Sequence, residues 1–361
     1  MATMLSWPRA FLRWPYAFAF CLSLTVGATA IYFSNKYDVG LKDPEGFLGP
    51  AYIRLPMLGI LLFAAGIIPL AIQRYGIGHI PSGVRTIIRT EWTFARVGYA
   101  ATGMVSFYIC YVSYRNLKSY LPLIGGDTIH DRALLELDHL LFFGNNPATV
   151  LHDVLGTTIT AQVLAALYVL YLPVVPITVA AVLVLHRDVT VGAWYATAVS
   201  LNWVLGTISY YTLPTLGPAF YEPQRFADLP DNGATQLQMS LVRGAFNFKE
   251  NPQGDSIFGI AGFASLHVSV VFTLALFLHY AGIARTIRIT AWIYLAFTVL
   301  ATLYLGWHYI ADDFGGLLIG WLAVATGAWA TGNTRRQKRK RLARAEASEG
   351  SAGGPSAPTV G

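Results

Sequence analysis

The sequence predicts an all-α fold: a polytopic membrane helical bundle of about eight transmembrane helices. Hydrophobic residues make up 55% of the 361-residue chain and charged residues only 12%. That charged fraction is about half of the roughly 25% found in soluble domains. No hydrophilic stretch is long enough to form a separate soluble domain. The composition therefore indicates one membrane domain with a short tail.

Eight apolar segments are long enough to cross the hydrocarbon core of a bilayer, which takes about 20 residues per helix. They lie near residues 15–34, 51–72, 92–113, 157–185, 192–213, 259–282, 286–305 and 308–331. The first segment also resembles a cleavable signal peptide, because it follows two arginines and contains "ATA" at 28–30. Its hydrophobic length of about 20 residues favours a retained helix. Cleavage would leave seven spans and change nothing in the argument about the site.

The positive residues predict the orientation of the bundle. An even number of spans places both termini on one side, and "RRQKRKRLAR" at 335–344 follows the last span with seven basic residues. Such a cluster marks the cytoplasmic side, where it meets anionic lipid. The other predicted cytoplasmic segments also carry arginines, namely Arg9, Arg13, Arg74, Arg85, Arg89, Arg187, Arg285 and Arg288. We expect a multi-pass protein of the cell membrane with both termini in the cytoplasm, and no nucleic-acid partner.

The chain divides into three regions: N-terminal transmembrane helices at 1–113, a helical domain at 114–334, and a basic, then disordered, tail at 335–361. Within 114–156, "DRALLELDHLLFFG" repeats leucines at helical spacing, which predicts an amphipathic helix at the outer interface. Within 214–258, proline and glycine predict an ordered loop with Arg225, Arg243 and Lys249 as its cations.

Two short stretches place ionisable side chains at the ends of apolar segments. "FASLHVSV" at 263–270 holds Ser265 and His267, and "GWHYIADDFGG" holds His308 and Asp312. His308 follows His267 by 41 residues, which is about two bilayer crossings of about 20 residues each. The sequence therefore predicts that both histidines lie at nearly the same depth, at the outer end of the bundle.

The spacing within each stretch suggests a chemistry. His308 and Asp312 are four residues apart and share a helix face, so the carboxylate can orient the imidazole, whereas Asp313 points elsewhere. Ser265 and His267 can face one point only if Ser265 lies in the turn that starts the helix, which Gly262 favours. Free backbone amides and a hydroxyl at such a turn form an anion site. Two histidines beside an anion site suit phosphoryl transfer, with one as nucleophile and one as acid.

Other uses of these residues are weaker alternatives. A metal would lack a third close ligand in the sequence, and Cys21 and Cys110 lie in apolar segments without zinc spacing, so no metal or cofactor is expected. A transporter or channel could use the same groups as a relay, but it predicts matched halves with broken helices. Pro173 and Pro176 are the only hint of such a break. A catalytically inactive relative is a third alternative, which the complete histidine and aspartate set disfavours.

At these residues the chain resembles the type 2 phosphatidic acid phosphatase superfamily, and most of all its inositol phosphorylceramide synthase (inositolphosphotransferase-like) branch. The Ser-x-His core of that family matches Ser265 and His267, and its His-x-x-x-Asp matches His308 and Asp312. "DRALLELDHLLFFGNNP" and "LPTLGP" also resemble that branch, so the similarity covers roughly residues 120 to 330. It implies a helical bundle with the site at the extracytoplasmic surface. His308 would form a phosphohistidine supported by Asp312, with His267 as general acid and Ser265 binding phosphate.

The chain departs from the family pattern at its cations. A Lys and Arg-Pro motif is not found before Ser265, and Thr302 stands where the family has an arginine. Arg243 and Lys249 are the candidates to bind phosphate instead. We expect a lipid phosphatase or phosphotransferase whose partner is a phospholipid, a polyprenyl phosphate or diphosphate, or a phosphatidylinositol-type donor. Water as acceptor makes it a phosphatase and an alcohol makes it a transferase; the sequence leaves this choice and the oligomeric state open.

Overall fold

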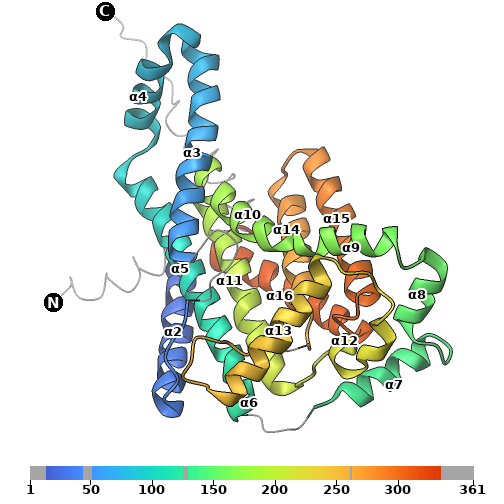
Figure 1. Cartoon of the computed structure of the whole chain (residues 1–361). Helices are drawn as coiled ribbons and strands as arrows, with labels where there is room; N and C mark the ends of the chain where they lie inside the picture. Colours follow the sequence, from blue (N-terminus) through green and yellow to red (C-terminus); the bar gives the residue numbers. More distant parts are fainter. Residues whose placement is uncertain (1–13, 44–50, 125–128, 261, 335–361) are drawn as a thin grey trace, which may run out of the picture.

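The computed structural model describes residues 14–43, 51–124, 129–260 and 262–334. Every regular element in these ranges is a helix, so the predicted all-α membrane bundle is confirmed (Figure 1). The basic cluster at 335–344, together with Arg9 and Arg13, lies outside the described residues.

All eight predicted segments are helical. They correspond to α2 (Ala17–Tyr37), α3 (Ala51–Tyr75), α5 (Phe94–Ser119), α9 with α10 (Ile159–Val169 and Tyr171–Leu185), α11 (Val189–Thr212), α14 (Leu266–Ala281), α15 (Arg285–Tyr304) and α16 (Ile310–Ala330). Among the described residues, five helical stretches are long and apolar enough to cross a membrane: α2, most of α3, α9 with α10, α15 and α16. Helix α14 is apolar but shorter, because the chain before Leu266 is not helical.

Helix α11 is the centre of the bundle. It packs against α5, α16, α10 and α14, and nearly every side chain from Val191 to Trp203 is buried. Small residues allow the close approach: a Cβ on Gly327 of α16 would lie 2.9 Å from the ring of Trp194. The indole Nε1 of Trp194 donates to the carbonyl of Val324 at 2.9 Å, which fixes the register of α11 against α16.

A buried polar network joins α11 to α14 and α16. The Asn202 side-chain amide donates to Thr273 Oγ1 at 2.9 Å, and its carbonyl accepts from the hydroxyl of Ser269. Thr273 in turn lies 3.4 Å from the carbonyl oxygen of Gly320. Because unpaired polar groups are costly inside a membrane domain, these partners specify how the three helices align.

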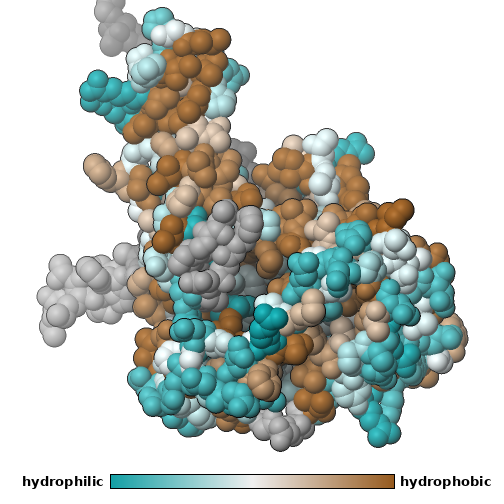
Figure 2. Space-filling view, viewed as in Figure 1, coloured by the Kyte–Doolittle hydropathy of each residue, from teal (hydrophilic) through white to brown (hydrophobic). Residues whose placement is uncertain are grey.

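Short helices cover one end of the bundle (Figure 1). They are α6 (Leu121–Ile124), α7 (Asp131–Leu141), α8 (Pro147–Leu155), α12 (Pro218–Tyr221), η2 (Pro223–Phe226) and α13 (Gly233–Glu250). Hydrophilic residues gather at this end, which is mostly teal in Figure 2. Helix α7 is the predicted amphipathic helix: Leu134 is buried, while Leu140 is 76% exposed.

The predicted ordered loop at 214–258 is wrong in part, because the 18-residue helix α13 fills much of it. Asn232 caps this helix and forms a reciprocal capping box with Thr235. The buried or half-buried positions of α13 recur at helical spacing, at Leu237, Leu241, Ala245 and Phe248. These local signals outweigh the flanking proline and glycine.

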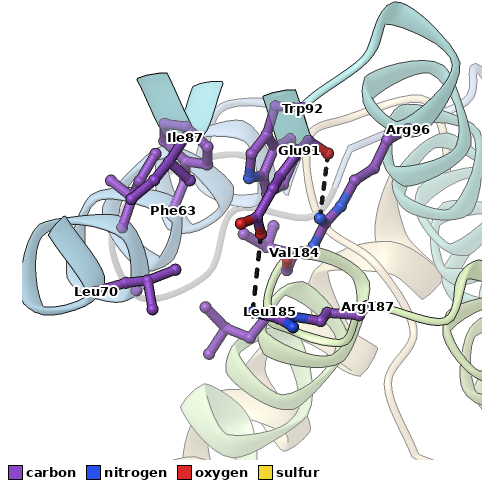
Figure 3. A pocket seen from close by; sticks show the side chains of 11 residues that line it. Phe63, Leu70, Ile87, Glu91, Trp92, Arg96, Val184, Leu185 and Arg187 are labelled. Atoms are coloured by element: carbon purple, nitrogen blue, oxygen red, sulfur yellow. Dashed lines mark hydrogen bonds and ion pairs between the residues drawn. The ribbon is translucent and has the colours of Figure 1, made fainter. Parts of the chain in front are cut away.

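At the other end, α3 and α4 (Ile80–Glu91) project beyond the bundle as an arm, joined by η1 (Ile77–His79) (Figure 1). A hollow of about 80 Å³ lies where the arm meets α5 and the end of α10. Glu91 and Arg96 meet there beside Trp92 and Arg187 (Figure 3). Arg96 donates to the carbonyls of Glu91 and Val184, both at 3.3 Å, and thereby ties α4, α5 and α10 together.

Candidate active site

A cavity of about 140 Å³ lies at the covered end of the bundle. Helices α5, α9, α10, α11, α13 and α14 and the turn before α16 form its wall. The wall is rich in aromatic rings and leucines, and it also carries two histidines and two cations. The wall includes Arg115, Lys118, Tyr168, Tyr171, Leu237, Leu241, His267, Trp307 and His308. Both predicted histidines therefore face one space.

His308 lies in the tight turn between α15 and α16. Gly306 adopts a φ of +70° in this turn, and the amides of Trp307 and His308 donate back to the carbonyl of Thr302 at 2.9 and 3.3 Å. His308 Nδ1 lies 3.3 Å from Asp312 Oδ2, which also accepts the amide of Tyr309 at 2.9 Å. Asp312 is fully buried. With Nδ1 occupied by this carboxylate, Nε2 is the nitrogen left for chemistry.

His267 lies in the first turn of α14, between two tyrosine rings. Its imidazole stacks on Tyr168 with 4.1 Å between ring centroids, and Tyr171 is also 4.1 Å away. The Tyr168 hydroxyl lies 3.3 Å from Nδ1. Nε2 is buried and has no hydrogen-bond partner among the described residues. Tyr168 also stacks on Trp307, at 4.9 Å, so one aromatic column connects the two histidine-bearing segments.

Ser265 occupies the turn at the start of α14, but its hydroxyl does not line the cavity. The hydroxyl caps the helix by accepting the amide of Val268 at 3.4 Å. The backbone amide of Ser265 donates to the carbonyl of Asp312 at 2.9 Å. A Cβ on Gly316 would lie 2.4 Å from the Ser265 carbonyl, so α16 packs directly on this turn. Ser265 thus joins the starts of α14 and α16.

Arg243 and Lys249 do not reach the cavity. Helix α13 presents Leu237 and Leu241 to it, and both cations lie on the opposite, exposed face. The cations on the cavity wall are Arg115 and Lys118, one turn apart on α5, where Arg115 Nε has no partner among the described residues. Lys118 is 8% exposed, and its ammonium lies over the ring of Tyr210 at 5.1 Å. A signal in the sequence pointed to them: two cations follow a predicted span on the outer side, against the positive-inside trend.

Two further carboxylates lie behind the His308 turn, both from α7. Asp131 accepts hydrogen bonds from the amides of Leu216 and Gly217, and Asp138 accepts from the amide of Ile310 at 3.1 Å. Burial raises the pKa of Asp138 to about 7, with a smaller contribution from the charge of Asp312. The sequence predicts α7 only as an interface helix and gives no sign of these contacts.

A family model described as "PAP2 superfamily" matches residues 132–326. The chain belongs to the PAP2 superfamily. Members of this superfamily are phosphoric ester hydrolases or phosphotransferases. Comparisons with curated proteins and with solved structures find no match. The matched region of this PAP2 protein contains both histidines and Asp312, whereas Arg115 and Lys118 lie outside it.

Within the described ranges, no three His, Cys, Asp or Glu side chains gather closely enough to hold a metal ion. What the cavity offers is a set of proton-transfer groups and cations. Two imidazoles, one oriented by a carboxylate, face the same space as a guanidinium and an ammonium group. Such a set can hold a phosphate, attack its phosphorus and protonate the departing oxygen.

Proposed function

We propose that the protein is an integral membrane lipid phosphatase or phosphotransferase that acts through a phosphohistidine on His308. One observation carries the proposal: His267 and His308 line the same cavity as Arg115 and Lys118. Membership of the PAP2 superfamily favours this enzyme over a transporter or channel.

The first step binds and attacks the phosphate. Arg115 and Lys118 hold its oxygens by charge-assisted hydrogen bonds. The Nδ1 proton of His308 is directed at Asp312, which leaves the Nε2 lone pair to form the bond to phosphorus. The imidazole becomes positively charged as this bond forms, and the buried Asp312 carboxylate stabilises that charge.

Departure of the lipid alcohol needs a proton. His267 supplies this proton as the cationic imidazolium: the Tyr168 hydroxyl oxygen accepts from Nδ1–H, and Nε2, the nitrogen without a partner, carries the proton that is transferred. As the bond between phosphorus and the leaving oxygen breaks, Nε2 gives its proton to that oxygen. In the second step His267 takes a proton from the acceptor, whose oxygen bonds to phosphorus while the bond to His308 breaks.

The surroundings of the cavity fit a lipid at a membrane surface. Leu237 and Leu241 of α13 line the cavity, and hydrophilic residues gather on the helices at this end, on the face shown in Figure 2. We place this end at the extracytoplasmic surface of the cell membrane, with both termini in the cytoplasm. The arginines of the α3–α4 arm at the opposite end support this orientation.

For the substrate we propose a lipid phosphate, with an inositol phosphorylceramide synthase-like transfer as one form of the reaction. Five tyrosines line the cavity, at 111, 114, 168, 171 and 210. Their hydroxyls could accommodate an alcohol acceptor as well as water. The chemistry at His308 is the same for both acceptors, so the acceptor alone separates phosphatase from transferase.

The test uses purified wild type and His308→Ala in detergent, assayed over a panel of lipid phosphates for phosphate release and headgroup transfer. Radiolabelled phosphate on the substrate shows whether an acid-labile, alkali-stable phosphoenzyme forms, as expected of phosphohistidine. We expect His308→Ala to lose both turnover and the label.

The matched control is His79→Ala, because His79 is exposed on the arm at the opposite end of the bundle. It should keep wild-type turnover. If turnover survives in His308→Ala, His308 is not the nucleophile. Flux across proteoliposomes without any turnover would favour the transporter instead.

A further inference from the structure

Helix α7 holds two buried carboxylates on one face, Asp131 and Asp138. They are seven residues apart, which is about two helical turns. Asp131 is 0% exposed and Asp138 is 3% exposed, although α7 lies at the surface of the covered end. Buried carboxylates are costly unless they are hydrogen-bonded. Their partners therefore show what α7 holds in place.

Asp131 binds the residue after His308 and a neighbouring loop that packs on the His308 turn. It accepts the amides of Leu216 and Gly217, each at 2.9 Å, and the hydroxyl of Tyr309 at 3.0 Å. Gly217 in turn packs on this turn, because a Cβ on it would lie 2.5 Å from the carbonyl of Trp307. One carboxylate thus connects the loop at residues 216–217, which packs on Trp307, with Tyr309, the residue after His308.

Asp138 binds the next residue along the chain. It accepts the amide of Ile310 at 3.1 Å, while Asp312 accepts the amide of Tyr309 at 2.9 Å. The two amides that follow His308 are therefore both held by buried carboxylates. These contacts stop the turn from rotating about the start of α16, and such a rotation would move the imidazole of His308.

We propose that Asp131 and Asp138 are positioning residues that hold His308 in its attacking orientation, with α7 as the supporting element. This inference rests on the proposed function, in which His308 is the nucleophile. Neither carboxylate lines the cavity, so both act through the backbone and through Tyr309. A shift of about 1 Å in a reacting group can cost about 100-fold in rate, so a small relaxation of the turn is enough to be measured.

A role in packing alone does not explain the choice of side chains. Three carboxylates, those of Asp131, Asp138 and Asp312, surround one turn, and like charges in one buried region repel. An apolar side chain on α7 would avoid that cost while filling the same space. The carboxylates are explained if their hydrogen bonds are needed to fix the turn.

The test compares Asp138→Asn with Asp138→Leu. Asparagine keeps an oxygen that can accept the Ile310 amide, and leucine removes it. Glu136→Gln is the matched control, because Glu136 lies on the exposed face of α7 and pairs with Arg132 at 2.9 Å. The measurements are kcat and KM on the lipid phosphate that gives turnover, and hydrogen exchange of the peptide containing residues 306–311.

We expect Asp138→Leu to speed exchange of the Ile310 amide about tenfold or more and to lower kcat between about 10- and 100-fold, with KM changed less than about threefold. Asp138→Asn should retain most of kcat, and Glu136→Gln should match wild type in both measurements. Unchanged exchange in α14 peptides shows that the bundle remains folded. Should Asp138→Leu not fold, Tyr309→Phe is the second variant, since it removes only the hydroxyl that Asp131 accepts, and kcat should again fall with KM retained.

Wild-type kcat in Asp138→Leu or in Tyr309→Phe would overturn the proposal, even if exchange rises. An equal loss in Asp138→Leu and Glu136→Gln would also overturn it, because the effect would then belong to α7 in general. The parent proposal fails separately, by turnover that survives His308→Ala. A result with His308 essential and α7 dispensable refutes the positioning role alone.

Discussion

The phenol ring of Tyr168 stacks on the imidazole of His267 at 4.1 Å between centroids, and its hydroxyl lies 3.3 Å from Nδ1. Stacking fixes the plane of the imidazole, and in the proposed mechanism the hydroxyl oxygen accepts the proton of Nδ1. Because Tyr168 also stacks on Trp307, it sets the distance between the segments of His267 and His308. Tyr168, a residue on α9, thereby helps to position His267 on α14 and His308 before α16 relative to each other.

Tyr168→Phe should separate these two effects of Tyr168. The ring and its stack remain, but the hydrogen bond between Nδ1 of His267 and the hydroxyl is lost, so the proton of the neutral imidazole is free to move to Nε2, the nitrogen that must accept a proton in the second step. We expect kcat to fall about tenfold or more, but by no more than the roughly 10²–10⁴-fold that general acid catalysis contributes in full, with KM little changed. The acidic and basic limbs of the kcat profile should also shift in pH.

The control for Tyr168→Phe is Tyr294→Phe. Tyr294 donates its hydroxyl to the carbonyl of Leu167 at 3.1 Å and does not line the cavity. It should leave the pH profile of kcat unchanged. A Tyr168→Phe profile that coincides with the wild-type profile would contradict a role for this hydroxyl in proton transfer.

Lys118→Met should weaken substrate binding. Methionine fills the space of the lysine stem but removes the ammonium that, in the proposed mechanism, faces the phosphate. Since charge-assisted hydrogen bonds are about twice as strong as neutral ones, we expect KM to rise about tenfold or more. Kinetics of Lys249→Met are the comparison, because Lys249 is exposed on the far face of α13. If KM rises as much for Lys249→Met as for Lys118→Met, Lys249 would again be a candidate for binding phosphate, as the sequence suggested.

The helices and the two histidines could be predicted from sequence because their signals are local or depend on length. Apolar runs of bilayer length gave the spans, and the interval of 41 residues between His267 and His308 corresponds to two crossings. The spacing of His308 and Asp312 predicted that the two side chains meet, and they lie 3.3 Å apart, but not on one helix face, because His308 precedes the start of α16. None of these features depends on how the helices pack against one another.

The cations and the α7 carboxylates depend on packing, so sequence could not place them. Helix α13 was expected to be a loop, and a loop gives no reason to turn Arg243 away from the site. As a helix, it must bury Leu241, which puts Arg243 on the exposed side. Asp131 and Asp138 lie in the predicted interface helix, but their role as acceptors could not be predicted, because it depends on where the start of α16 lies.

Asp138 should make stability depend on pH in the direction opposite to an ordinary surface carboxylate. Its pKa in the folded protein is about 7, against an ordinary value of 3.8. Between these values the folded state binds more protons than the unfolded state, so the free energy of unfolding falls as pH rises from about 4 to about 7. Asp138→Asn removes this contribution. The measurement is the difference in thermal midpoint between wild type and Asp138→Asn from pH 4.5 to 8 in detergent.

The thermal midpoint of wild type should fall relative to that of Asp138→Asn as pH rises. The difference between the two midpoints should become constant above about pH 7. Glu136→Gln, on the exposed face of α7, should show no comparable trend. A constant difference between wild type and Asp138→Asn at every pH would contradict the raised pKa.

Glu91→Gln should loosen the arm without affecting turnover. Glu91 pairs with Arg74 at 2.5 Å and lies 3.9 Å from Arg187, beside the hollow drawn in Figure 3. The hydrogen bond from Arg74 lowers the pKa of Glu91, so the pair stabilises the folded protein above the ordinary pKa of a glutamate. Because the pair is partly exposed, we expect the free energy of unfolding to fall by about 0.5–1 kcal/mol, and by less at high salt.

Thermal unfolding at low and high salt measures both losses. The value of kcat should stay at that of wild type, because the arm projects from the end of the bundle opposite the cavity. Breaking the more exposed pair in Glu136→Gln should cost less. Equal losses in the two variants, or a fall in kcat for Glu91→Gln, would contradict a purely local role for the cluster.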